Sequence, residues 1–127
     1  MNDSSVVYKM TYDGEQTMML LGDAEWVCSN DLVDNCADKL KSDIVQVGHH
    51  GCGNVSGKCY DLIDAEVYIW PVGEKFWYSE CGEGLNTHNT GVIRSRAYMM
   101  RHNPNMKNIY VVKDDILSSP LPMKIYK

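Results

Sequence analysis

The sequence predicts an α/β fold in which a mixed β-sheet carries flanking helices. Two observations indicate this fold: an opening hairpin pattern over residues 5–21, and short apolar runs that then alternate with segments of helical spacing. The predicted order is hairpin, helix, strand, helix, strand, helix, strand, which is typical of layered α/β proteins. With 127 residues the chain has the length of one ordinary domain, and we treat residues 1–127 as a single domain.

The opening hairpin is indicated by alternation and by a turn signal. Val6, Tyr8 and Met10 alternate with polar or less apolar residues over positions 5–12, which predicts a half-buried strand. Asp13-Gly14 is a two-residue turn signal, and residues 16–21 form the returning strand.

A helix is predicted over residues 31–41, with Ser29-Asn30 as its N-terminal cap. Aspartates in its early turns and lysines in its last turn favour the helix dipole. One apolar stripe at helical spacing is formed by Leu32, Val33, Cys36, Ala37 and Leu40.

The next segments alternate between strand and helix patterns. Residues 44–47 read as a short buried strand, and residues 48–57 as a loop with four glycines. Residues 58–64 are expected to form a short helix, and residues 67–70 a strand that ends at Pro71.

The C-terminal part begins with a long aromatic and glycine-rich loop at residues 73–89, a length often associated with function. A helix is predicted over residues 90–101, a strand over 108–112 and an edge strand over 123–126.

Composition excludes several classes of protein. Hydrophobic residues are 44% and charged residues 23%, which is typical of globular chains, and the net charge of −5 argues against a free-standing nucleic-acid-binding module.

No apolar run approaches the roughly 20 residues of a membrane span, so we expect no membrane contact by this chain. The five cysteines are odd in number and include no Cys-x-x-Cys pair, so we expect reduced thiols in a cytoplasmic setting.

Chemistry-bearing residues follow two of the predicted strands. Asp23 comes after residues 18–21, and His49 and His50 come after residues 44–47 between two glycines. Ligands of α/β sheets gather at the carboxyl ends of strands, so these side chains are expected to share one rim. A carboxylate and imidazoles are metal ligands, but two or three are fewer than the four of a typical zinc site. The pattern therefore indicates part of a metal site.

These segments resemble a known family. The series Leu-Leu-Gly-Asp at 20–23 and Asp-Ile-Val-Gln-Val-Gly-His-His-Gly at 43–51, after Asn-Asp-Ser-Ser-Val-Val at 2–7, is similar to the C-terminal half of metallo-β-lactamase-fold hydrolases. The closest similarity is to the hydrolase domain of competence proteins of the ComEC type. Asp23 and His49 are 49 − 23 = 26 residues apart with one predicted helix between them, and the resemblance covers roughly residues 2–100.

The resemblance implies half of an αββα sandwich and a two-metal site that holds zinc or manganese. It makes Asp23 the bridging carboxylate and His49 the late metal ligand. His50 orients the substrate or serves as the ligand instead, and the two alternatives stay open. His88, in the segment Asn-Thr-His-Asn at 86–89, is a second candidate catalytic residue, although this segment lacks the proline of the related branch.

The chain departs from the family at one motif, because His-x-His-x-Asp-His does not occur in it. We therefore expect the complete protein to hydrolyse a phosphodiester, in a small molecule or a nucleic acid, with a missing N-terminal half supplying the other ligands. The isolated chain is expected to be inactive and to bind zinc or manganese weakly or not at all. An uncovered apolar sheet face is expected to promote a homodimer. The alternatives are a non-catalytic α/β interaction domain that self-associates, and a site assembled from two chains.

Overall fold

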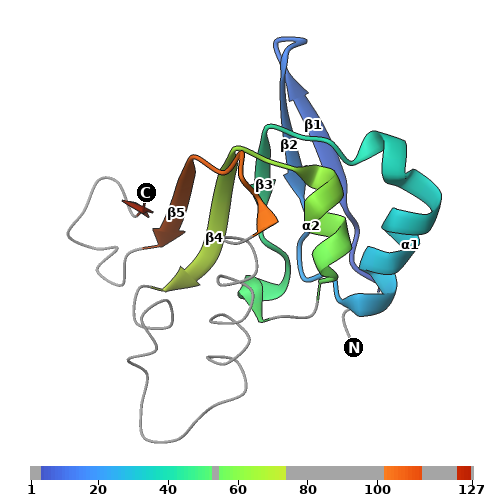
Figure 1. Cartoon of the computed structure of the whole chain (residues 1–127). Coiled ribbons are helices and arrows are strands. Elements are labelled where there is room, and N and C mark those ends of the chain that lie inside the picture. The colour runs from blue at the N-terminus through green and yellow to red at the C-terminus, as the bar shows by residue number, and fades with distance from the viewer. Residues whose placement is uncertain (1–3, 53–54, 74–101, 113–122, 127) are drawn as a thin grey trace, which may run out of the picture.

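The computed structural model describes residues 4–52, 55–73, 102–112 and 123–126 (Figure 1). It confirms the α/β fold class: the strands form one six-stranded mixed sheet in which each strand pairs with its neighbour in sequence. The predicted loop at 73–89, from residue 74 on, and the predicted helix at 90–101 lie outside the described residues. No helix in the described part of the chain is long and apolar enough to cross a membrane.

The sheet is parallel in its centre and antiparallel at both ends. Four successive strands run parallel, and an antiparallel strand is added at each edge. The predicted strands are confirmed as β1 (Tyr8–Tyr12), β2 (Gln16–Leu20), β3 (Ile44–Gln46), β4 (Val67–Gly73), β5 (Asn108–Val112) and β6 (Met123–Tyr126).

The turn between β1 and β2 forms as its sequence predicts. Asp13 and Gly14 both have positive φ, at 51° and 75°, which matches the twist that a tight antiparallel hairpin requires. The amide of Glu15 closes the turn by donating to the carbonyl of Tyr12 at 3.2 Å.

Helix α1 (Trp26–Cys36) begins five residues earlier than the sequence predicts, and a short helix η1 (Ala37–Lys39) follows it. The predicted cap is wrong because Ser29 lies inside the helix. Its buried hydroxyl donates to the carbonyl of Trp26 and accepts from the amide of Ser56 at 3.0 Å. The first turn of α1 therefore has no acidic residue and its last turn no basic one, so the predicted dipole pairing does not occur.

Helix α2 (Gly57–Ile63) confirms the prediction for residues 58–64. The Ser56 hydroxyl caps it by accepting from the amide of Cys59 at 3.3 Å, a bond that satisfies one of the free N–H groups of the first turn. Asp64 ends the helix in a left-handed conformation.

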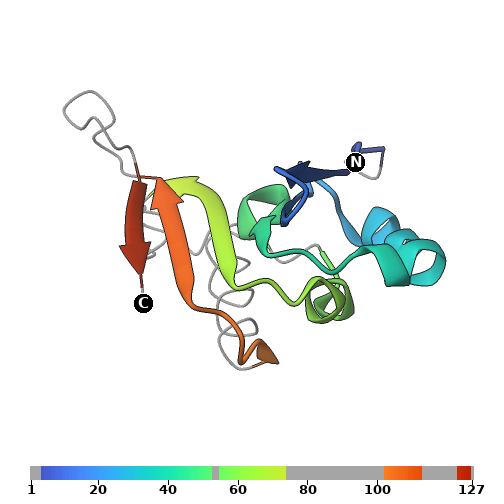
Figure 2. The same ribbon diagram turned by 90° about the horizontal axis from the view of Figure 1, so that it is seen from above.

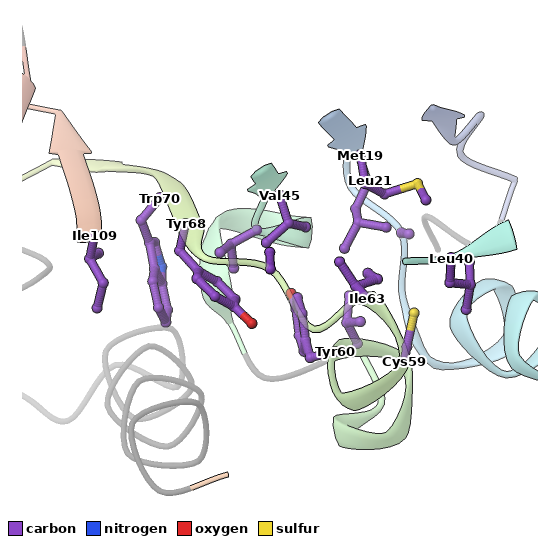
Figure 3. Close-up of a cluster of buried hydrophobic side chains, with 14 of the residues drawn as sticks. Met19, Leu21, Leu40, Val45, Cys59, Tyr60, Ile63, Tyr68, Trp70 and Ile109 are labelled. Carbon is purple, nitrogen blue, oxygen red and sulfur yellow. The ribbon is translucent and has the colours of Figure 1, made fainter. Parts of the chain in front are cut away.

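Both helices lie on the same face of the sheet (Figure 2). In β4 every second residue points toward them and is buried, which gives this strand a strict alternation of buried and partly exposed positions. Figure 3 shows the resulting core, in which strand side chains meet residues of α2 and the segment after α1. Its members include Met19, Leu21, Leu40, Val45, Cys59, Tyr60, Ile63, Tyr68, Trp70 and Ile109.

Strand β1 is not half-buried as its alternation predicts. Tyr8, Met10 and Tyr12 are 59%, 52% and 77% exposed, and all five residues of the strand are exposed. Lys9 points to the helix side of the sheet, because its ammonium donates to the carbonyls of Lys39 and Lys41 at 2.9 and 2.6 Å. The apolar side chains of β1 therefore lie on the opposite sheet face, where they are exposed.

Strand β4 does not end at Pro71 but continues to Gly73. The prediction fails because the ladder to β5 shifts register between Trp70 and Gly73, so that Pro71 lies in a bulge where its missing N–H costs no regular hydrogen bond.

Asp43 connects β2 to the start of β3 and makes folding stability pH-dependent. Its Oδ2 accepts from both the hydroxyl and the amide of Thr17 at 2.7 Å, and these two hydrogen bonds hold the Asp43 pKa below the ordinary 3.8. The folded state therefore binds fewer protons than the unfolded state between the two pKa values. The stabilisation that these two hydrogen bonds provide is present above about pH 4. It is lost as the pH falls through the folded-state pKa of Asp43.

We predict that Asp43→Asn weakens this pH dependence, because asparagine does not titrate. Urea unfolding between about pH 2.5 and 5 should give a smaller slope of unfolding free energy against pH than in the unmodified protein. Asp13→Asn, in the exposed hairpin turn, is the matched control and should leave the slope unchanged. Equal slopes for both variants would show that Asp43 does not carry the effect.

Candidate functional site

Two loops at the carboxyl ends of adjacent parallel strands form the candidate site. One loop joins β2 to α1 and carries Asp23, and the other follows β3 and carries His49 and His50. The Gly22 carbonyl accepts from the amide of His49 at 3.0 Å, and the Gly22 amide donates to Oε1 of Gln46 at 2.8 Å. The sheet thus brings the predicted residues to one rim, as expected for ligand sites in such folds.

The histidine loop has an unusual backbone. Both His49 (φ 44°, ψ 49°) and His50 (φ 54°, ψ 15°) are left-handed within the short turn η2 (Gly48–Gly51). Non-glycine residues adopt this conformation rarely, at a cost on the order of 1 kcal/mol each or more, so the surroundings must hold them there. Such strain is concentrated at functional sites.

Two buried aromatic side chains hold this turn. The Tyr60 hydroxyl accepts from the amide of Gly48 at 3.1 Å, and the Trp70 indole N–H donates to the carbonyl of His50 at 3.0 Å. Burial raises the pKa of Tyr60, so its hydroxyl stays protonated at neutral pH. Both turn glycines lie against side chains: a Cβ at Gly51 would overlap the Trp70 indole, and one at Gly48 would come within 2.7 Å of Val55.

His50 is oriented by the bulge in β4. Its Nδ1 lies 2.8 Å from the carbonyl oxygen of Pro71. A carbonyl can only accept, so Nδ1 carries the hydrogen, and the neutral ring presents its lone pair at Nε2. Nε2 lies 3.6 Å from Oδ1 of Asp23, and the two side chains are 55% and 50% exposed. The neutral His50 Nε2 and the Asp23 carboxylate are both hydrogen-bond acceptors, and they face each other where solvent can reach them. A proton or a cation between them would bind to both.

A second carboxylate–imidazole pair lies beside the first. Nδ1 of His49 lies 3.4 Å from Oε1 of Glu25, and both side chains are more deeply buried, at 16% and 23% exposure. The two histidine rings are 6.3 Å apart between centroids and meet edge to face. Sequence reasoning missed Glu25, although its position two residues after Asp23 on the same connection was the available signal.

The structure brings Asp23 together with His50, and it pairs His49 with Glu25. Of the two alternatives for the histidine pair, the geometry therefore favours His50 as the partner of Asp23, with His49 beside it. His88 lies outside the described residues.

The Cys52 thiol lies close enough to Asp23 to be affected by its charge. Burial raises the pKa of its thiol above the ordinary 9.0, and the negative charge of Asp23 raises it further, so the thiol stays protonated at neutral pH. The four cysteines in the described residues, Cys28, Cys36, Cys52 and Cys59, form no disulfide.

The donors suit a divalent cation in kind but not in number. A carboxylate and an imidazole with its second nitrogen bonded to a carbonyl are typical ligands of zinc or manganese. Within the described residues, however, no group of three or more His, Cys, Asp or Glu side chains is arranged to hold a metal ion. Catalytic zinc sites take three protein ligands, so a metal here requires donors from elsewhere.

Comparison with protein-family models, with curated proteins and with solved structures gives no match for this chain.

The contact between Gly51 and Trp70 predicts a specific stability loss. Gly51→Ala places a methyl group inside the indole of Trp70, whereas Gly14→Ala, at the same φ of 75°, has nothing within 4 Å. Both positions have the same positive φ, so the difference between the variants reports mainly on the overlap. Urea unfolding should show Gly51→Ala less stable than Gly14→Ala by about 1–3 kcal/mol. Equal stabilities would mean that the indole does not pack against the turn.

Proposed function

We propose that this chain provides one part of a metal-dependent hydrolase site of the metallo-β-lactamase superfamily. The observation that supports this best is the Asp23–His50 pair, in which a backbone carbonyl fixes the imidazole tautomer and leaves Nε2 facing a carboxylate at 3.6 Å. Histidines that bind metals commonly donate their other ring N–H to a carbonyl or carboxylate.

In this proposal each described residue has a distinct role. Asp23 and His50 are the metal ligands of this chain, and the Pro71 carbonyl orients His50. The neighbouring His49, held by Glu25, is placed to contact the substrate or to serve as a further ligand. A divalent cation bound at such a site would supply Lewis acidity toward the scissile group. The remaining ligands come from outside the described residues.

The proposed substrate is a phosphodiester, by resemblance to the ComEC-type branch. The net charge of −5 does not exclude such a substrate, because the cation and not a basic surface would attract the phosphate. The free thiols are compatible with the proposed cytoplasmic setting.

A second candidate is a non-catalytic α/β interaction domain that retains half of the fold. It is favoured by one separate observation, the exposed apolar side chains of Tyr8, Met10 and Tyr12 on β1. A large exposed apolar patch marks an interaction surface.

Binding of Mn²⁺ tests the first proposal, because Mn²⁺ prefers oxygen and imidazole donors to thiols. Titration calorimetry should show weak binding to the unmodified chain, since two protein donors hold a cation poorly. His50→Gln should weaken this binding by about tenfold or more, as expected on loss of a ligand. His102→Gln, an exposed histidine far along the sequence, is the matched control and should leave the affinity unchanged.

Two results would contradict the proposal. Equal Mn²⁺ affinity for the His50→Gln and His102→Gln variants would show that His50 is not a ligand. Metal-dependent turnover of bis(p-nitrophenyl) phosphate by the isolated chain would show that the site is complete without further ligands.

A further inference from the structure

The sheet face opposite α1 and α2 is apolar across several strands. Strand pairing assigns its members: Tyr8 pairs with Leu20 and Met10 with Met18, and the register then continues into β3, β4 and β5. The apolar side chains of this face, all exposed or partly exposed, are Tyr8, Met10, Tyr12, Met18, Leu20, Ile44, Val67, Ile69 and Tyr110. We call this set the open face.

The open face is also uncharged. The other positions of this face in β1 to β5 whose side chains the structure describes include Gln16, Gln46, Pro71 and Asn108, and none of them is Asp, Glu, Lys or Arg. The lysine of β1, Lys9, points to the other side and is bonded to carbonyls near η1. The chain has a net charge of −5, so the charged surfaces of two copies would repel each other. An uncharged surface of this extent lets two copies meet without that repulsion.

Three side chains of β1 alone expose a substantial part of the area that a stable interface requires. At about 150–250 Å² for each large side chain, the exposures of Tyr8, Met10 and Tyr12 amount to roughly 400 Å². A stable interface buries about 800 Å² per partner, so these three side chains supply about half of it. The partly exposed side chains of β2 to β5 are placed to supply the remainder.

We propose that the open face is the interface of a homodimer, in which the sheets of two copies pack face to face. In a two-fold dimer the same patch lies on both sides, so an uncharged apolar face is complementary to itself. Two twisted sheets pack in this way about 10 Å apart, with interdigitating side chains. Tyrosine and methionine, which dominate the β1 edge of this face, are enriched in interfaces.

Sedimentation equilibrium of the whole chain tests the dimer. The unmodified chain should sediment as a dimer of twice 14.4 kDa at micromolar concentration. Met10→Glu places a charge on the open face and should raise the dimer dissociation constant at least about tenfold, because the charge would be buried without a partner. Thr11→Glu adds the same charge at the next position, which is also exposed but points to the helix side, and should change the constant less than about twofold.

Circular dichroism of both variants confirms that each is folded before its dissociation constant is compared. A monomer at all concentrations, or aggregation beyond a dimer, would overturn the proposal. It would also be overturned if Met10→Glu left the dimer intact, or if Thr11→Glu dissociated it equally, since the contact would then not involve the open face. None of these outcomes depends on metal binding at His50, so the test is separate from that of the proposed function.

Discussion

The left-handed turn at His49 and His50 is the constraint on which the candidate site depends. Two consecutive non-glycine residues in this conformation are unfavourable by themselves, and two hydrogen bonds hold the turn in place: the Tyr60 hydroxyl accepts from the Gly48 amide, and the Trp70 indole donates to the His50 carbonyl. Because the turn is held on both sides, His50 can reach the Pro71 carbonyl and present Nε2 to Asp23. That carbonyl belongs to the part of β4 in which the ladder to β5 shifts register, between Trp70 and Gly73.

The sheet topology connects this site to the open face. Parallel strands β2 and β3 place their following loops at the same rim, so the carboxylates and histidines meet there. The same strands have their helices on one side only within the described residues, which leaves an apolar face on the other (Figure 2). Within the described residues, the site has fewer ligands than a metal centre requires, and one face of the sheet carries no helix.

The sequence predicted the fold class and most strands, because alternation and turn residues report directly on sheet structure. It predicted the start of α1 wrongly, because Ser29 is a common capping residue and only its tertiary contact with Ser56 shows that it is buried in the helix. It predicted that Asp23 and the histidine pair share a rim, but it could not distinguish His49 from His50. That distinction depends on the Pro71 carbonyl, 21 residues away and inside a bulge that no local pattern reveals.

The tautomer of His50 tests the account most directly. A long-range ¹H–¹⁵N correlation spectrum at about pH 8.5, well above the ordinary histidine pKa, distinguishes the two ring nitrogens, and His50→Gln assigns the signals. The account predicts that His50 carries its hydrogen at Nδ1 and leaves Nε2 unprotonated. An Nε2–H tautomer, or the averaged signals of a freely exchanging ring, would contradict it, because the Pro71 carbonyl would then not orient the imidazole toward Asp23.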